Sequence, residues 1–176
     1  PMQGPPQAML KAIRILDSIS LWSGRIVAWL IIPMVLSLVY EVVARYIFNA
    51  PTVWAYDMTF MLYGSFFMIG SAYTLQRKGH IRTDSYYGAW SPRTQGWVDS
   101  VCYLLLFFPP LVFFLVVGWD FFFKSWGQGE RIVTSPWMPV VYPFKLAIPV
   151  ATLLLLLQGV SEFTKSLWAA LKGEWL

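Results

Sequence analysis

The chain has 176 residues, of which 57% are hydrophobic and only 12% are charged. A soluble domain carries about a quarter of its residues as charged side chains, so this composition excludes an ordinary soluble fold and indicates a protein that is solvated by lipid. The net charge of +4 comes from basic residues placed between apolar segments, where they set orientation and meet membrane lipid headgroups, so we expect no nucleic-acid partner.

The first seven residues are rich in Pro and Gly, and we expect them to be disordered. Residues 8–22 then show the pattern of an amphipathic helix that lies on the membrane surface. Apolar or small residues recur there at helical spacing opposite three charged ones: Met9, Ile13, Leu16 and Ser20 are expected opposite Lys11, Arg14 and Asp17.

Four later segments reach the roughly 20 mainly apolar residues that a helix needs to cross the hydrocarbon core. They cover residues 23–46, 53–75, 97–119 and 144–167. They form a four-helix transmembrane domain at 23–168, which a cytoplasmic tail follows at 169–176. The predicted fold is therefore an all-α integral membrane protein with four transmembrane helices and a short N-terminal amphipathic interfacial helix.

Three of the four segments contain proline: Pro33 in the first, Pro109 and Pro110 in the third, and Pro149 in the fourth. Each proline removes a backbone donor, which membrane helices tolerate only where neighbouring groups satisfy the freed carbonyl. We therefore expect these helices to be bent.

The orientation follows from the basic residues at the two ends of the helices. One side holds nine of the 13 Lys and Arg residues, and the other side holds Arg45, Lys124, Arg131 and Lys145. The richer side is expected to be cytoplasmic, which places both termini and the loop 76–96 in the cytoplasm and the segments 48–51 and 121–142 outside.

The chain offers little equipment for catalysis, because it contains one histidine, His80, and one cysteine, Cys102. A bis-histidine haem site or a zinc-protease helix needs two histidines, and a lone thiol forms no intrachain disulfide. Glycine-rich phosphate and dinucleotide motifs are absent from the sequence. We predict that the chain is not an enzyme and has no catalytic, cofactor-binding or metal site, and that Cys102 serves packing.

Two polar features lie near the outer ends of the first two helices. Glu41 and Arg45 are four residues apart, a spacing that brings opposite charges together on one helix face. They form either a helix-end ion pair or a contact to a partner subunit. Asp57 lies in the first turn of the second helix, where the helix dipole favours an acid, so it serves helix-end stabilisation or recognition.

Two further features lie in loops. Gly79 is expected to cap the end of the second helix, with His80 and Asp84 after it either paired or in a solvated loop. In the outer loop, Glu130 and Arg131 are expected to form a surface pair of little energetic weight.

Taken in order, these pieces resemble the small membrane subunit of tripartite ATP-independent periplasmic (TRAP) transporters, the DctQ-like family. The resemblance covers about residues 20–165 and rests on the run from Glu41 to Pro51, Trp54, Asp57, Gly70, Tyr73, the run from His80 to Asp84, the run from Pro143 to Leu146, and the pair Gln158 and Gly159. The chain departs from the family at Asp57, where glutamate is more frequent.

The resemblance implies a complex in the bacterial inner membrane. A large DctM-like membrane subunit would hold the substrate and sodium sites, and a periplasmic substrate-binding protein would deliver an organic acid anion. The present chain would enlarge the static scaffold. Its candidate interface or structural residues are Glu41, Arg45, Asn49, Trp54, Asp57, His80 and Asp84, with the first five at the outer end and the last two in the cytoplasmic turn.

Two other functions fit four helices. The chain could anchor a redox complex in the membrane, although a single histidine is a poor basis for haem or quinone binding. It could also be a small transporter or channel that acts alone. Such a pathway would call for ionisable groups or broken helices that converge at mid-membrane, whereas the charges here lie near the helix ends.

Overall fold

The computed structural model describes residues 4–79 and 84–176, and these residues are mainly helical. An isolated antiparallel bridge joins Arg131 to Val140. The elements in chain order are α1 (Gln7–Ala28), α2 (Ile31–Tyr46), α3 (Ala55–Gln76), α4 (Asp84–Tyr87), α5 (Pro92–Cys102), the π-helix η1 (Tyr103–Phe107), α6 (Phe108–Gln128), α7 (Tyr142–Lys145) and α8 (Ala147–Lys172). The predicted all-α class is confirmed.

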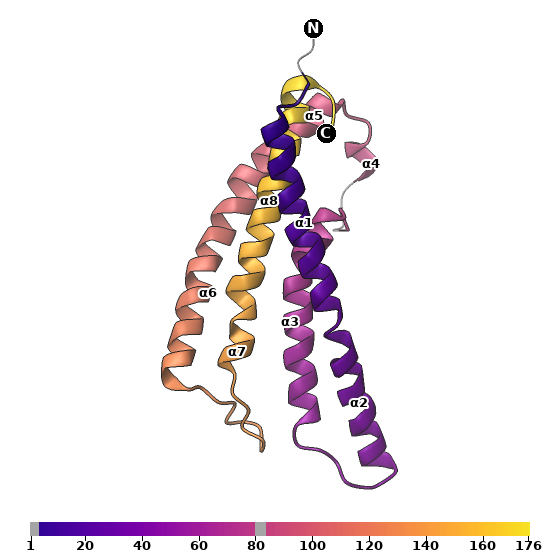
Figure 1. Cartoon of the computed structure of the whole chain (residues 1–176), viewed down its shortest axis with the longest axis vertical. Coiled ribbons are helices and arrows are strands. Elements are labelled where there is room, and N and C mark those ends of the chain that lie inside the picture. Colours follow the sequence, from indigo (N-terminus) through magenta and orange to yellow (C-terminus); the bar gives the residue numbers. More distant parts are fainter. Residues whose placement is uncertain (1–3, 80–83) are drawn as a thin grey trace.

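Within the described residues, four helical spans are long and apolar enough to cross a membrane, as the sequence predicted: Gln7–Tyr46, Ala55–Gln76, Pro92–Gln128 and Tyr142–Lys172. At 1.5 Å per residue the 22-residue α3 is about 33 Å long, which matches a hydrocarbon core of about 30 Å. The 40-residue first span is about 60 Å long. Figure 1 shows the longer spans extending past α3 toward the end of the molecule where both termini lie.

The first span differs from its predicted division at residues 22 and 23. The helix α1 continues without a break to Ala28, and the interruption falls at Trp29 and Leu30. The cause is Pro33, because a proline ring clashes with the carbonyl four residues before it, here that of Trp29. The backbone N–H groups of Trp29 and Leu30 bond three residues back instead of four, at 3.2 and 2.9 Å. Placement of residues 8–22 on the membrane surface stays a prediction.

The other prolines also coincide with irregular backbone. The π-helix η1 ends directly before Phe108 and Pro109, where the missing N–H of proline shifts the hydrogen-bond register. A break at Leu146 separates α7 from α8, three residues before Pro149. The expectation of bent membrane helices therefore matches the places where the structure interrupts them.

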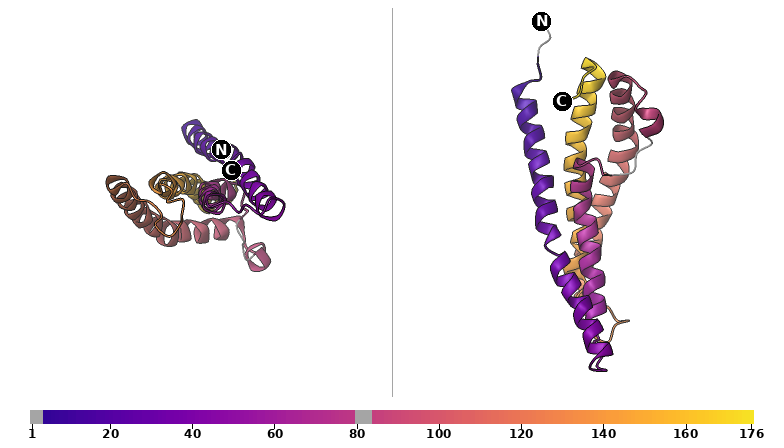
Figure 2. Two further views of the ribbon diagram at one scale, coloured as in Figure 1. Left: turned by 90° about the horizontal axis from the view of Figure 1, so that it is seen from below. Right: turned by 90° about the vertical axis from the view of Figure 1, so that its right-hand side faces the viewer.

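Helix α8 is the centre of the packing. Figure 2 (left) shows α3 and α8 between α1 and α2 on one side and α6 on the other. Small residues let the neighbouring helices approach α8 closely, as is common where membrane helices pack. A Cβ on Gly96 of α5 would lie 2.3 Å from the backbone nitrogen of Ala170, so only glycine fits at this crossing.

Candidate functional site

At the outer end of α2, Glu41 joins the helix to the loop that follows it. Its carboxylate accepts hydrogen bonds from Arg45 Nε at 2.8 Å and from the backbone N–H of Thr52 at 3.0 Å, and the Arg45 Nη2 and Thr52 hydroxyl groups also donate to it. The Glu41 side chain is 14% exposed and that of Arg45 is 54% exposed. Glu41 thus holds the loop, while the guanidinium of Arg45 remains open on its outer side. No feature of the sequence pointed to Thr52 as a partner of Glu41.

Asn49 and Trp54 shape the same loop through the backbone and through ring packing. Asn49 has a φ of 50°, in the left-handed region that asparagine tolerates better than most residues. The chain turns there so that the N–H of Ala50 bonds to the carbonyl of Ala44 at 2.9 Å. Trp54 precedes α3, and its ring centroid lies 5.6 Å from that of Tyr40. Both residues therefore fix how α2 returns into α3.

Asp57 lies in the first turn of α3 and holds a different loop. It accepts a hydrogen bond from the hydroxyl of Ser135, a buried residue of the segment between α6 and α7. The Ser135 oxygen in turn accepts the backbone N–H of Trp137 at 3.3 Å. Arg45 and Asp57 were both expected to help organise the outer end, and in the described contacts they belong to separate groups.

The predicted pair of Glu130 with Arg131 is wrong. Glu130 pairs with Lys145 of α7, while Arg131 Nη1 donates to the carbonyl of Met138 at 3.1 Å. Adjacent residues in extended backbone point their side chains to opposite sides, so Glu130 and Arg131 do not readily pair with each other. The hydrogen bond from the Lys145 ammonium lowers the pKa of the Glu130 carboxyl below its ordinary value.

The other end of the bundle contains a group that we name the inner polar cluster: Asp17, Gln76, Gln158, Ser161, Glu162 and Lys165. The Asp17 carboxylate accepts hydrogen bonds from Lys165 Nζ at 2.9 Å, from the Ser161 hydroxyl at 2.6 Å and from Gln158 Nε2 at 3.0 Å. Lys165 also donates to Glu162 at 2.8 Å. These contacts join α1 to α8.

Helix α3 joins the same cluster through Gln76, whose Nε2 donates to the backbone carbonyl of Asp17 at 2.8 Å. The side chains of Asp17, Lys165 and Glu162 are only 26%, 19% and 8% exposed. Partly buried charges of this kind are tolerated when they are paired and hydrogen-bonded, as they are here. The inner polar cluster therefore fixes the relative positions of α1, α3 and α8.

The sequence interpretation placed Asp17 on the wrong face of its helix. We grouped it with Lys11, but Ile13, Asp17 and Ser20 follow each other at spacings of four and three residues, which puts them on one face. Ile13 and Ser20 are buried, and Asp17 lies between them. The spacing of Gln158, Ser161, Glu162 and Lys165 on one face of an otherwise apolar span was the second available signal.

The end of α3 is capped one residue earlier than predicted. Lys78 holds the left-handed position with a φ of 52°, and Gly79 follows it. The N–H of Gly79 bonds to the Thr74 carbonyl at 2.9 Å and that of Lys78 to the Leu75 carbonyl at 3.0 Å, the pattern of a Schellman cap. His80 lies outside the described residues, as does the side chain of Asp84, which begins α4.

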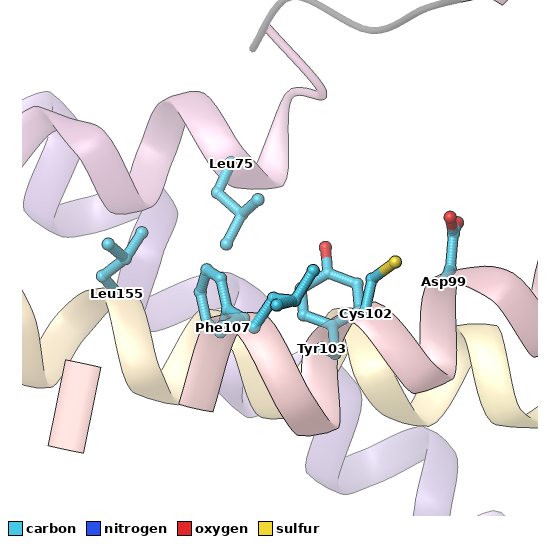
Figure 3. A pocket seen from close by; sticks show the side chains of 7 residues that line it. Leu75, Asp99, Cys102, Tyr103, Phe107 and Leu155 are labelled. Carbon is cyan, nitrogen blue, oxygen red and sulfur yellow. The ribbon is translucent and has the colours of Figure 1, made fainter. Parts of the chain in front are cut away.

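A pocket of about 490 Å³ opens between α3, α5, η1 and α8 (Figure 3). Leu75, Phe107 and Leu155 lie at one end of the view and Asp99 lies at the other. Asp99 accepts a hydrogen bond from the Tyr87 hydroxyl at 2.6 Å. Cys102 was predicted to be packing, but it is exposed and lines this pocket. The lining is mainly apolar and suits hydrocarbon better than a polar substrate.

The polar side chains described above make structural contacts at both ends of the bundle. Among residues 4–79 and 84–176, no three His, Cys, Asp or Glu side chains gather as they would around a metal ion. The polar groups bind one another and tie loops or helices together. The arrangement is that of a helical membrane bundle with an apolar surface.

Comparison with known proteins agrees with this arrangement. No curated protein matches the chain. Residues 34–168, which are well over half of the chain, match the family model of the DctQ component of tripartite ATP-independent periplasmic transporters. This matched region includes the second and third spans, most of the fourth, Arg45, Asp57 and most of the inner polar cluster. The chain therefore belongs to the DctQ family and is a membrane component of a TRAP transporter.

Proposed function

We propose that this protein is a non-catalytic small permease subunit that scaffolds a large DctM-like membrane subunit. The complex takes up an organic acid anion, coupled to sodium, after a periplasmic binding protein delivers it. Substrate and sodium bind to the large subunit, and no cofactor is required on this chain. The membership in the DctQ family is the observation that carries the proposal.

The distribution of charge and polarity supports a scaffold. The ion pairs lie toward the ends of the long spans, where Glu41 meets Arg45, Glu130 meets Lys145 and Asp17 meets Lys165. A transport pathway of its own would place ionisable groups around a site near the middle of the bilayer. The polar contacts of the described residues hold helices and loops in position instead.

The position of the termini supports the proposed orientation. Both lie at the same end of the bundle, as four crossings require (Figure 1). Lys11, Arg14, Lys165 and Lys172 lie on helices toward that end, and basic residues favour the cytoplasmic side. We therefore place this end in the cytoplasm and the loops at 47–54 and 129–141 in the periplasm of a bacterial inner membrane.

The proposal is tested by deletion and purification in native membranes. Removal of this chain is expected to abolish sodium-dependent uptake of the organic anion, and an affinity tag on it is expected to recover the large subunit. Normal uptake after deletion, together with purification of the chain alone, would refute the proposed function. Uptake by liposomes that contain only this chain would instead support a transporter that acts alone.

A further inference from the structure

One face of α3 points away from the rest of the protein. Its exposed residues are Tyr56, Phe60, Tyr63 and Phe67, which we name the α3 seam; their exposed fractions are 75%, 67%, 54% and 67%. They follow one another at spacings of four, three and four residues, so they form a continuous stripe along the helix. This alternation of three and four is also the spacing at which one helix packs along another.

The depth of Tyr63 in the membrane is unusual for a tyrosine. Because α3 has 22 residues and is about 33 Å long, its ends lie near the two edges of the hydrocarbon core. Tyr63 is the ninth residue of this helix, so its Cα lies within about 5 Å of the middle. Tyrosine ordinarily lies at the headgroup level, where water satisfies its hydroxyl.

No hydrogen bond joins the Tyr63 hydroxyl to a described residue, whereas three shorter hydroxyl side chains of α3 donate to their own helix backbone. Thr59 donates to the Ala55 carbonyl at 2.8 Å, and Ser71 donates to the Met68 carbonyl at 2.7 Å. A tyrosine hydroxyl lies at the far end of its ring and cannot reach the backbone of its own helix in this way. Exposure of an unbonded hydroxyl to hydrocarbon is unfavourable, so acyl chains are a poor match for this position.

The outward faces of the neighbouring helices have a different composition. On α2, Ile32, Val35 and Val39 are exposed, and on η1, Leu105 and Leu106 are exposed. These aliphatic side chains carry no polar atoms and suit lipid. Tyr40 of α2 also exposes its ring, but it packs on Trp54 where α3 begins, at the membrane edge. Compared with these aliphatic residues, the α3 seam carries a hydroxyl at mid-depth and does not differ by apolarity alone.

Space beside the α3 seam is open to another helix. A Cβ built on Gly64 or Gly70 would meet no heavy atom within 4 Å. A groove of about 190 Å³ runs next to the seam, with Phe60 and Gly64 on one side and Ile148 of α8 on the other. Small residues of this kind allow the backbones of membrane helices to approach closely.

We propose that the α3 seam packs against a transmembrane helix of the large subunit, and that this helix presents a hydrogen-bonding group to the Tyr63 hydroxyl near the middle of the bilayer. The inference rests on the proposed function, because it takes the large subunit as the partner. It adds which face of this chain is covered and what the covering helix must offer at that depth.

The test is photocrosslinking in native membranes that contain both subunits. A photoreactive amino acid replaces Phe60 in one protein and Leu36 of α2 in a matched control. Both positions are well exposed, at 67% and 62%. The contact between Tyr40 of α2 and Trp54 before α3 places these two residues at the same depth. Leu36 lies four residues deeper than Tyr40, and Phe60 lies six residues deeper than Trp54, so the two test positions lie at similar depth. We expect an adduct with the large subunit from position 60 and none from position 36.

Two kinds of failure can be distinguished. If the unmodified subunits co-purify but the adduct with the large subunit forms only from position 36, the inference is wrong and the proposed function stands. Adducts from position 60 with lipid alone, or with a second copy of this chain, also refute the inference. If the unmodified subunits do not co-purify, the proposed function itself fails.

Substitutions give a second readout. Tyr63→Phe removes only the hydroxyl, and we expect about threefold weaker association in lipid nanodiscs, the usual size of one interhelical hydrogen bond. Gly70→Trp places a bulky ring on the seam and is expected to weaken association at least about tenfold. Gly127→Trp is the control, because Gly127 is equally open but lies on α6. Unchanged melting of each isolated variant would show that the fold is intact. If all three variants bound the large subunit as tightly as the wild-type chain does, the inference would be refuted.

Discussion

Replacement of Asp17 by alanine is expected to detach α1 from the bundle. The substitution removes the acceptor for Lys165, Ser161 and Gln158 at once. Gln158 is completely buried and Lys165 is 19% exposed, so water replaces the lost partner only in part. Lys165 keeps its contact with Glu162 at 2.8 Å, which limits the loss.

The magnitude follows from these contacts. A hydrogen bond to a charged group contributes about 1.5–3 kcal/mol net, and a buried group left without its partner costs about 1–3 kcal/mol. The Asp17 side chain is 26% exposed, so the contributions are reduced and not additive. We expect Asp17→Ala to lower the free energy of unfolding by about 2–4 kcal/mol and Asp17→Asn, which keeps the shape, by about 1–2 kcal/mol.

The assay is reversible unfolding of the purified chain in mixed micelles, followed by circular dichroism. Lys11→Ala serves as the control, because Lys11 is an exposed residue of the same helix. A double-mutant cycle with Lys165→Met isolates the ion pair, with an expected coupling of about 1–3 kcal/mol. If Asp17→Ala stayed within about 0.5 kcal/mol of wild type, the inner polar cluster would not hold α1 as reasoned here.

Three further predictions concern the rest of the bundle. Gly96→Ala is expected to lower the free energy of unfolding by about 1–3 kcal/mol in the same assay, because its Cβ would overlap the α8 backbone. Gly127→Ala is the control and is expected to be neutral, because its Cβ would meet nothing within 4 Å. Equal effects of the two substitutions would contradict the close crossing. The Lys145 partner lowers the pKa of Glu130 in the folded protein. The pair therefore stabilises the outer loop fully at pH values above the ordinary glutamate pKa, and this stabilisation is lost as the pH falls through the lowered pKa of the folded state. The protection of loop amides, taken relative to the intrinsic exchange rate at each pH, should therefore hold above the ordinary glutamate pKa and fall below it, and less so in Glu130→Gln; identical profiles would refute the role of the pair. Arg45→Ala is expected to reduce complex recovery or transport more than Lys172→Ala, and equally small effects on both would count against an outer interface.

Membrane spans could be predicted from the sequence because hydrophobic length is a local property. Three of the four predicted segments fall within the observed spans, and the second, 53–75, begins two residues before α3. The third observed span, Pro92–Gln128, extends well beyond the predicted residues 97–119 at both ends. The extension at 92–96 could not be read from hydrophobicity, since its residues are mostly polar and it is stabilised by packing. The Gly96 crossing with α8 supplies that packing and joins distant parts of the chain.

The polar contacts were predicted only where both partners lie in the same helix. Glu41 and Arg45 are one turn apart, and helix geometry brings them together. The partners of Asp17 and Asp57 lie 148 and 78 positions away in the sequence, at Lys165 and Ser135. Contacts at such separations depend on how the helices pack, which a single sequence does not reveal.

The most direct test of the scaffold function is purification of the tagged chain from native membranes, followed by mass spectrometry of the proteins that accompany it. A large, multi-spanning membrane protein recovered in stoichiometric amount, with organic-anion uptake lost when this chain is deleted, is the expected result. A chain that is recovered alone, in cells whose uptake is independent of it, would contradict the assignment of this protein as a transporter scaffold.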